Sequence, residues 1–239
     1  MTNTDSHAIQ LNQLRFRYEH SGDAPWIVDI DSLEIQRGKQ CLLRGQSGCG
    51  KSTLLHLICG LMTPNHGTVS VNGVDIHGLS GSARDAFRSR NIGVIFQEFN
   101  LLEGFSALEN VMLALMFSPV PAKEHRERAR ALLDQLGITS PGRDPARMSV
   151  GQRQRVAVAR ALACEPVIVL ADEPTASLDP ENGAAAIDMI QSACNSHNAA
   201  LLCVSHDPAL DGVFEHRLRF EELCAQPATE EARSAHGHD

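Results

Sequence analysis

Between residues 8 and 76, apolar residues alternate with polar ones. Ile9 and Leu11, for example, are separated by a single glutamine, and this period of two is typical of a strand with one buried face. The Asn72-Gly73 pair within the stretch indicates a tight hairpin turn. We therefore expect mainly strands in this part of the chain.

One short strand of this stretch leads into a glycine-rich loop. Residues 40–44 are predicted as the strand, and residues 52–59 continue beyond the loop as a predicted helix that Gly60 can end. The resulting order is strand, glycine loop, helix.

The pattern becomes helical from about residue 82 to residue 164. Residues 124–133 are charged and rich in helix-forming residues. Prolines, which interrupt helices, lie on both sides of that segment, at Pro119, Pro121, Pro141 and Pro145. We expect an inserted helical subdomain here.

After Glu165 the strand pattern returns. Residues 167–171 and 200–204 are continuous apolar runs, which are typical of parallel strands buried on both faces. Between them, Asp179 followed by Pro180 predicts the start of a helix, with the aspartate as its cap.

Composition restricts the class of protein. The 239 residues can form one large domain or two small ones, and no apolar run approaches the roughly 20 residues that a membrane span requires. Residues 1–7 lack the pattern of a signal peptide, and seven cysteines without C-x-x-C spacing are typical of a reducing compartment. A net charge of −8 argues against nucleic acid as the main partner. These features predict a cytoplasmic protein.

The end of the chain is small, polar and charged. We expect residues 225–239 to form a flexible tail, in which His236 and His238 are solvated rather than bound to a metal.

The glycine-rich loop fits the pattern G-x-x-x-x-G-K-[ST], which binds nucleoside triphosphates. Its glycines let the backbone approach phosphate oxygens, and the following helix points the positive end of its dipole at them. Lys51 would neutralise the terminal phosphates and Ser52 would ligate Mg²⁺. A chance glycine-rich turn is the alternative, but the strand before and the helix after the loop argue against it. The expected nucleotide-binding residues are Gly45, Gln46, Ser47, Gly48, Cys49, Gly50, Lys51, Ser52 and Thr53.

Two carboxylates follow the buried run 167–171. Ligands of open α/β sheets bind at the carboxyl ends of the strands, so Asp172 can hold the metal and Glu173 can polarise the attacking water. The alternative is that both acids only cap the turn at Pro174-Thr175, which would leave the phosphate loop without a metal partner.

Three further runs carry a resemblance to a known family. Residues 148–155, 159–162 and 170–175 resemble the signature and Walker B segments of ATP-binding cassette (ABC) ATPases, and the match extends from about Ile9 to Phe220. The resemblance implies an α/β fold in which a P-loop NTPase (RecA-like) core carries an antiparallel β subdomain and an inserted α-helical subdomain. It implies one domain over residues 1–239, with the core at 1–81 and 166–224 and the helical subdomain at 82–165.

In that family the nucleotide is sandwiched between the phosphate loop of one subunit and the signature of another. The resemblance therefore implies an ATPase that works as a dimer with two composite sites. Ser149, Gly151 and Gln152 would contact the γ-phosphate bound by the partner. The family pattern is Leu-Ser-Gly-Gly-Gln, so Met148 and Val150 depart from it; a positive φ at Val150 would be strained.

Four other residues match positions of known role in the family. His206 matches the switch histidine that reaches the γ-phosphate, and Gln97 matches the glutamine that touches Mg²⁺ or the lytic water. Asp179 matches the loop that couples the two sites, and Tyr18 matches the aromatic residue that stacks on adenine. Each also has a plain alternative: a surface residue after a strand for His206 and Gln97, a helix cap for Asp179, and core or edge packing for Tyr18.

Cys49 lies inside the phosphate loop, where a helix N-terminus can lower the pKa of a thiol. We expect ATP to protect this cysteine from alkylating reagents.

Residues 96–111 resemble cassettes that serve lipoprotein-releasing, macrolide-exporting and related mechanotransmitting permeases. The resemblance implies that the region from Gln97 to Val111 docks a separate membrane permease, so that the chain is peripheral at the inner face of the cell membrane, with ATP and Mg²⁺ as cofactors. The same apolar residues are also candidates for the core of the helical subdomain. An importer cassette, or a switch subunit that signals through a membrane partner without transport, remains an alternative.

Overall fold

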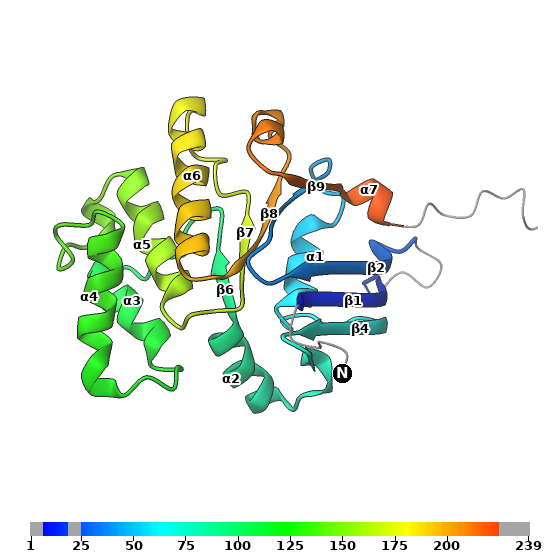
Figure 1. Cartoon of the computed structure of the whole chain (residues 1–239), viewed down its shortest axis with the longest axis horizontal. Helices are drawn as coiled ribbons and strands as arrows, with labels where there is room; N and C mark the ends of the chain where they lie inside the picture. The colour runs from blue at the N-terminus through cyan, green and yellow to red at the C-terminus, as the bar shows by residue number, and fades with distance from the viewer. Residues whose placement is uncertain (1–6, 19–24, 225–239) are drawn as a thin grey trace, which may run out of the picture.

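The computed structural model describes residues 7–18 and 25–224, and it contains two sheets beside a group of helices (Figure 1). One sheet is antiparallel with the order β2-β1-β4-β5, and the other has the order β6-β7-β8-β3-β9 with parallel pairing throughout. The predictions on residues 1–6 and on the tail 225–239, including His236 and His238, lie outside the described residues.

The antiparallel sheet comprises β1 (His7–Phe16), β2 (Val28–Gln36), β4 (His66–Val71) and β5 (Val74–Asp75). Asn72 and Gly73 join β4 to β5, and both have positive φ, at 52° and 76°. This is the conformation that a two-residue hairpin turn of the favoured hand requires. The predicted hairpin is therefore confirmed.

The parallel sheet comprises β3 (Gln40–Arg44), β6 (Ile92–Ile95), β7 (Ile168–Asp172), β8 (Ala200–Ser205) and β9 (His216–Arg219). Helix α1 (Lys51–Ile58) packs on one face, and α5 (Val150–Leu162) and α6 (Pro180–Ser196) pack on the other. In β8, Leu202 and Val204 belong to the core around α1, whereas Leu201 and Cys203 belong to the core around α5 and α6. Burial on both faces explains why this strand is apolar at every position up to Val204.

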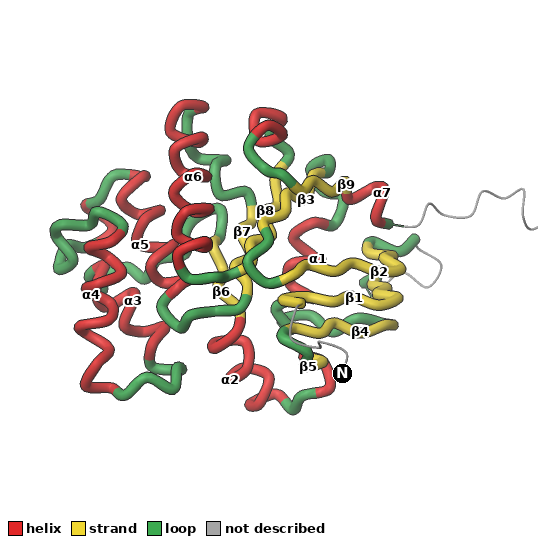
Figure 2. The backbone as a smooth tube through the Cα atoms, in the orientation of Figure 1, coloured by secondary structure: helices red, strands yellow, loops and turns green. Residues whose placement is uncertain are grey.

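The helical part has a core of its own. Helices α3 (Ala107–Leu115), α4 (His125–Gln135) and α5 contribute buried residues to one cluster, which includes Val111, Leu133 and Val156. Figure 2 shows these helices gathered at the end of the molecule that lies away from the antiparallel sheet. Ser106 and Glu109 form a capping box that starts α3.

The range 82–165 contains one strand in addition to its helices. Helix α2 (Gly81–Asn91) leads into β6, and β6 pairs with β7 at the edge of the parallel sheet. β6 is the strand that the sequence predicts directly before Gln97. The division into core and helical subdomain stays a prediction.

The parallel sheet brings several loops to one edge. The carboxyl ends of β3, β6, β7 and β8 lead into the phosphate loop, Gln97, Glu173 and His206, respectively. Ligands bind at this edge in open α/β sheets.

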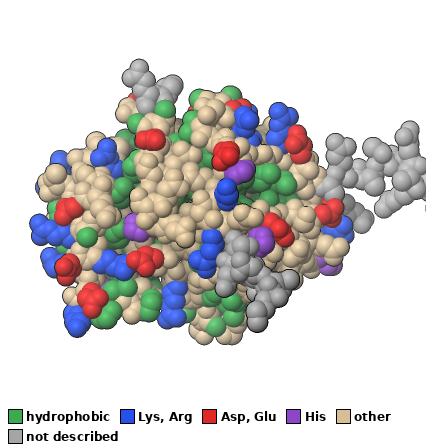
Figure 3. Space-filling model, viewed as in Figure 1, with side chains coloured by type: hydrophobic (Ala, Val, Ile, Leu, Met, Phe, Trp, Pro, Cys, Tyr) green, Lys and Arg blue, Asp and Glu red, His purple; other side chains and the backbone are tan. Residues whose placement is uncertain are grey.

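Within the described residues, no helix is both long enough and apolar enough to span a membrane. On the face shown in Figure 3, acidic and basic side chains are interspersed over the surface.

Candidate active site

The phosphate loop connects β3 to α1 and encloses the side chain of Lys51. This lysine is 6% exposed, and its Nζ donates to the carbonyl oxygens of Gly45 and Gln46, each at 2.8 Å. Gly50 has a φ of 114°, and a Cβ atom there would lie 2.9 Å from the carbonyl oxygen of Ile27. Glycine is therefore required at this position both for its backbone conformation and for space.

Asp172 ends β7 and faces Ser52 at the start of α1. Burial raises the pKa of the Asp172 carboxyl, a hydrogen bond from Ser52 opposes that rise, and the neighbouring charge of Glu173 adds to it. Its Oδ1 is buried and has no hydrogen-bond partner among the described residues. An unpartnered carboxylate oxygen beside a hydroxyl fits Mg²⁺, which takes one or two carboxylates and completes its shell with phosphate and water oxygens. No group of three or more His, Cys, Asp or Glu side chains in the described part of the chain could hold a metal by itself.

Glu173 lies between β7 and the end of β8, in a left-handed backbone conformation with φ of 45°. Its N–H donates to the carbonyl oxygen of Val204 at 2.9 Å, which ties this unusual backbone to the sheet. One carboxylate oxygen lies 2.8 Å from Nδ1 of His206, and the other accepts from the hydroxyl of Ser205 at 3.1 Å. The structure thus brings Glu173 and His206 into direct contact.

Gln97 follows β6 in a loop that an arginine of α5 holds in place. Phe99 and Asn100 have positive φ values of 61° and 47°. The Arg160 guanidinium donates to both of their carbonyl oxygens, at 2.6 Å to that of Phe99. Gln97 itself is exposed and lines a cavity of about 340 Å³ together with Val150. Arg160 belongs to the run 159–162, whose pattern gives no sign of this contact.

The signature residues start α5. The Ser149 hydroxyl accepts from the N–H of Gln152 at 3.2 Å, and the Gln152 side chain accepts from the N–H of Ser149 at 3.1 Å. Val150 occupies the first position of α5, and it is not among the described residues with positive φ. The strain considered for Val150 is therefore absent. Gly151 follows in the helix, and a Cβ atom at this position would meet no other atom within 4 Å.

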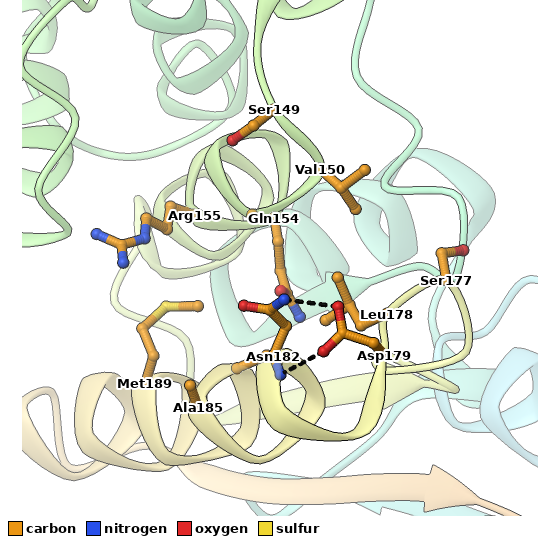
Figure 4. A pocket seen from close by; sticks show the side chains of 12 residues that line it. Ser149, Val150, Gln154, Arg155, Ser177, Leu178, Asp179, Asn182, Ala185 and Met189 are labelled. Carbon is orange, nitrogen blue, oxygen red and sulfur yellow. Dashed lines mark hydrogen bonds between the residues drawn. The ribbon is translucent and has the colours of Figure 1, made fainter.

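Asp179 starts α6 and lies across a cavity from the signature. Its carboxylate accepts from the N–H of Asn182 at 3.1 Å and from the side-chain amide of Asn182 at 2.6 Å. Figure 4 shows Val150 and Gln154 of α5 directed toward Asp179 and Asn182 of α6. The cavity between the two helix starts has a volume of about 430 Å³.

Gln154 connects α5 to the strand that carries the carboxylates. It is 1% exposed, and its Nε2 donates to the carbonyl oxygen of Pro174 at 3.0 Å, one residue beyond Glu173. Gln154 belongs to the signature run 148–155 but has no expected role there. A glutamine on the buried side of an otherwise apolar helix face was the available signal.

Tyr18 and Cys49 are the two remaining residues that the sequence predicts to bind nucleotide. Tyr18 follows β1, and its ring is 53% exposed and packs edge-to-face on Phe16 with centroids 5.1 Å apart. Cys49 has its Sγ 3.9 Å from Nζ of Lys51. Burial raises the pKa of the Cys49 thiol, and the charge of Lys51 only partly opposes this. Desolvation of the thiolate therefore outweighs the attraction of the lysine at this position, and protection of Cys49 by ATP stays a prediction.

The predicted site residues thus fall into two groups. Lys51, Ser52, Asp172, Glu173 and His206 gather at the carboxyl edge of the parallel sheet. Ser149, Gly151 and Asp179 line the cavity between α5 and α6 instead. Within the described residues, no hydrogen bond joins the signature residues to the phosphate loop.

Comparison with known proteins agrees with this arrangement. The family model of the ABC transporter matches residues 28–176. The lipoprotein-releasing system ATP-binding protein LolD of Pseudomonas syringae pv. tomato is 36% identical over 219 residues, which cover 91% of this chain and 96% of the relative. LolD of Bordetella pertussis is 37% identical over 230 residues, with 94% and 98% covered.

Solved structures show the same similarity. The dimeric structure of the ATP-binding cassette MJ0796 in a post-hydrolysis state, bound to ADP and Pi, has a TM-score of 0.77 at 31% identity and covers 88% of this chain and 93% of that one. A second dimeric MJ0796 structure, described as a bacterial ABC transporter cassette, has a TM-score of 0.76 at 32% identity, with 89% and 94% covered. The P-loop fold, the nucleotide-binding loop and the match to the family model together show that this chain belongs to the ABC transporter family, as one of its ATP-binding and ATP-hydrolysing cassettes.

Proposed function

We propose that two copies of this chain close around two ATP molecules. The main support is that the phosphate loop and the signature residues lie on different elements of one chain. Among the described residues, no hydrogen bond joins the two groups. The start of α5 presents free backbone N–H groups at Val150 and Gly151, which suit a phosphate. The dimeric cassette structures that resemble this chain support the same arrangement.

In this proposal the first group of residues performs the chemistry. Lys51 leaves the carbonyl oxygens of the loop to neutralise the terminal phosphates, and Glu173 accepts the proton of the attacking water. His206 orients Glu173 and reaches the γ-phosphate. Ser52 and Asp172, with Gln97, would hold Mg²⁺, which neutralises charge on the phosphate oxygens when bound. Tyr18 stacks on the adenine, and Asp179 links the two sites.

We further propose a membrane permease as the partner. Four apolar side chains are exposed in or near the region from Gln97 to Val111, namely Leu102 (50%), Phe105 (42%), Met116 (65%) and Phe117 (65%). Of these four, Phe117 also lines a groove of about 310 Å³, together with Phe96 and Leu61. Apolar surface of this kind marks a contact with another protein. Phe99, Leu108 and Val111 of the same region are buried and serve the core instead.

The similarity to LolD proteins supports release of lipoproteins from the cytoplasmic membrane as the process that the chain drives, with the chain itself on the cytoplasmic face. The test has two parts. Glu173→Gln should form a stable dimer with Mg-ATP in gel filtration, and a monomer at all ATP concentrations would contradict the sandwich. Co-purification that identifies a permease partner, followed by a lipoprotein-release assay of the complex in proteoliposomes, tests the process. ATP turnover without release would favour the importer or switch alternative.

A further inference from the structure

The last described helix, α7 (Phe220–Leu223), lies against the phosphate loop. Phe220 is 3% exposed and lies close to two glycines of the loop. A Cβ atom on Gly45 would lie 3.0 Å from Cβ of Phe220, and one on Gly50 would lie 3.1 Å from its Cζ. The loop therefore rests directly on α7.

The next residue of α7 bonds to the loop itself. Oε1 of Glu221 accepts from the backbone N–H of Gln46 at 3.0 Å. That N–H belongs to the same peptide unit as the carbonyl oxygen of Gly45, which accepts from Nζ of Lys51 at 2.8 Å. One peptide unit is thus held at both ends by opposite charges, the Lys51 ammonium on its oxygen and the Glu221 carboxylate on its N–H. Hydrogen bonds in such a series polarise and strengthen one another.

The pKa of the Glu221 carboxyl is consistent with these hydrogen bonds. Hydrogen bonds from its own N–H and from that of Gln46 hold the pKa of the Glu221 carboxyl below its usual value, and the charge of Lys51 adds to the effect. The carboxylate is therefore ionised at neutral pH. A carboxylate this near a phosphate site would weaken phosphate binding by repulsion unless its hydrogen bond to the loop outweighs that cost.

We propose that Glu221 is a positioning residue for nucleotide binding: it fixes the Gly45–Gln46 peptide so that the loop keeps the shape in which Lys51 reaches the phosphates. The inference rests on the proposed phosphate role of this loop. It predicts an effect on nucleotide affinity and none on turnover at saturating ATP, because Glu221 touches neither the attacking water nor Glu173.

The experiment uses the full chain with three substitutions. Glu221→Ala removes the acceptor, Glu221→Gln keeps an acceptor without the charge, and Glu222→Ala removes the neighbouring carboxylate, which pairs with Arg219 at 3.6 Å instead of with the loop. Binding of Mg-ADP is measured by isothermal titration calorimetry, because ADP probes the phosphate loop without the γ-phosphate that the signature would contact.

We expect Glu221→Ala to weaken Mg-ADP binding by about 3- to 10-fold, as for the loss of one partly solvated charged hydrogen bond. Glu221→Gln should lie between Glu221→Ala and the wild type, and Glu222→Ala should bind as the wild type does. The amide resonance of Gln46 should shift in Glu221→Ala and stay in place in Glu222→Ala, which a general loss of stability would not produce.

Unchanged or tighter Mg-ADP binding in Glu221→Ala would overturn the inference, since repulsion of the phosphates would then dominate. Equal loss in Glu221→Gln and Glu221→Ala would also overturn it, because the charge and not this hydrogen bond would be responsible. A wild-type chain that fails to bind Mg-ADP would instead overturn the proposed site as a whole.

Discussion

Nδ1 of His206 lies 2.8 Å from Oε1 of Glu173, and the two side chains differ sharply in exposure, at 59% and 14%. The exposed histidine covers a carboxylate whose other oxygen is held by Ser205 at 3.1 Å. A base held at both oxygens has a defined orientation, and each oxygen keeps a lone pair that can accept from a water. The contact explains how the end of β8 can control the carboxylate at the end of β7.

The first prediction concerns that carboxylate. Glu173→Gln keeps acceptor capacity toward Ser205 but removes the base, so ATP binding should stay intact while hydrolysis slows by about 10²- to 10⁴-fold. Steady-state phosphate release and nucleotide binding measure the two quantities. Glu165→Gln is a matched control, because that residue pairs with Arg128 at 2.6 Å away from the site. Turnover at the wild-type rate in Glu173→Gln would refute the assignment of the base.

Lys51→Ala should weaken nucleotide binding itself, by about tenfold or more, because a charge-assisted contact to phosphate is lost. The substitution also leaves the carbonyl oxygens of Gly45 and Gln46 without the donor that they have in the structure. Lys39→Ala, at an exposed turn, is the control for loss of a positive charge. Equal Mg-ATP affinity in Lys51→Ala and the wild type would remove the phosphate role.

The thiol of Cys49 should react with alkylating reagents in a way that depends on pH and on nucleotide. Because burial raises its pKa, less thiolate is present at pH 7 than for a free cysteine, and the rate should rise with pH to beyond the usual thiol pKa. Mg-ATP should slow labelling at every pH, since it occupies the loop. Mass spectrometry of the peptide that contains Cys49 gives the rate, with the partly exposed Cys164 beside Ala114 as an internal reference away from the loop. Equal labelling with and without Mg-ATP would contradict the prediction.

The elements that create the site were largely predictable from local patterns. Continuous apolar runs marked β7 and β8, and the glycine loop marked the step from β3 to α1. Because the carboxyl ends of parallel strands lie side by side, parallel pairing then predicts that Asp172, Glu173 and His206 lie at the same edge of the sheet. This prediction needs only the strand pattern and no knowledge of contacts between individual side chains.

What escaped prediction depends on contacts between distant residues. Glu221 meets Gln46 across 175 positions, and Arg160 meets Phe99 across 61. The left-handed backbone at Phe99 and Glu173 has no sequence marker, since neither is glycine or asparagine. For Cys49, the loop position suggested a low pKa, but burial could be judged only from the folded chain.

Val150 can be tested against the glycine of the family pattern. Because it occupies the first position of α5 without positive φ, Val150→Gly should relieve no strain. We expect a loss of stability of up to about 1 kcal/mol from the weaker helix propensity of glycine. Dimer formation by Glu173→Gln with Mg-ATP should change less than about threefold, because the backbone N–H that would meet the phosphate is kept. A tenfold gain in dimerisation would show that Val150 obstructs closure.

Gln154 offers the last prediction, because its buried amide joins the signature helix to the segment after Glu173. Gln154→Leu keeps the volume of the side chain and leaves the carbonyl oxygen of Pro174 without its donor, which should cost about 1–3 kcal/mol of the free energy of unfolding. Thermal unfolding should therefore occur about 2–4 °C lower for each kcal/mol lost. Gln135→Leu on the exposed side of α4 should leave the melting temperature nearly unchanged.

The Gln154→Leu substitution also has an expected effect on catalysis. Because Pro174 follows the catalytic carboxylate directly, Gln154→Leu should lower turnover at saturating ATP more than it raises KM. A variant that melts lower but turns over ATP at the wild-type rate would assign Gln154 to stability alone.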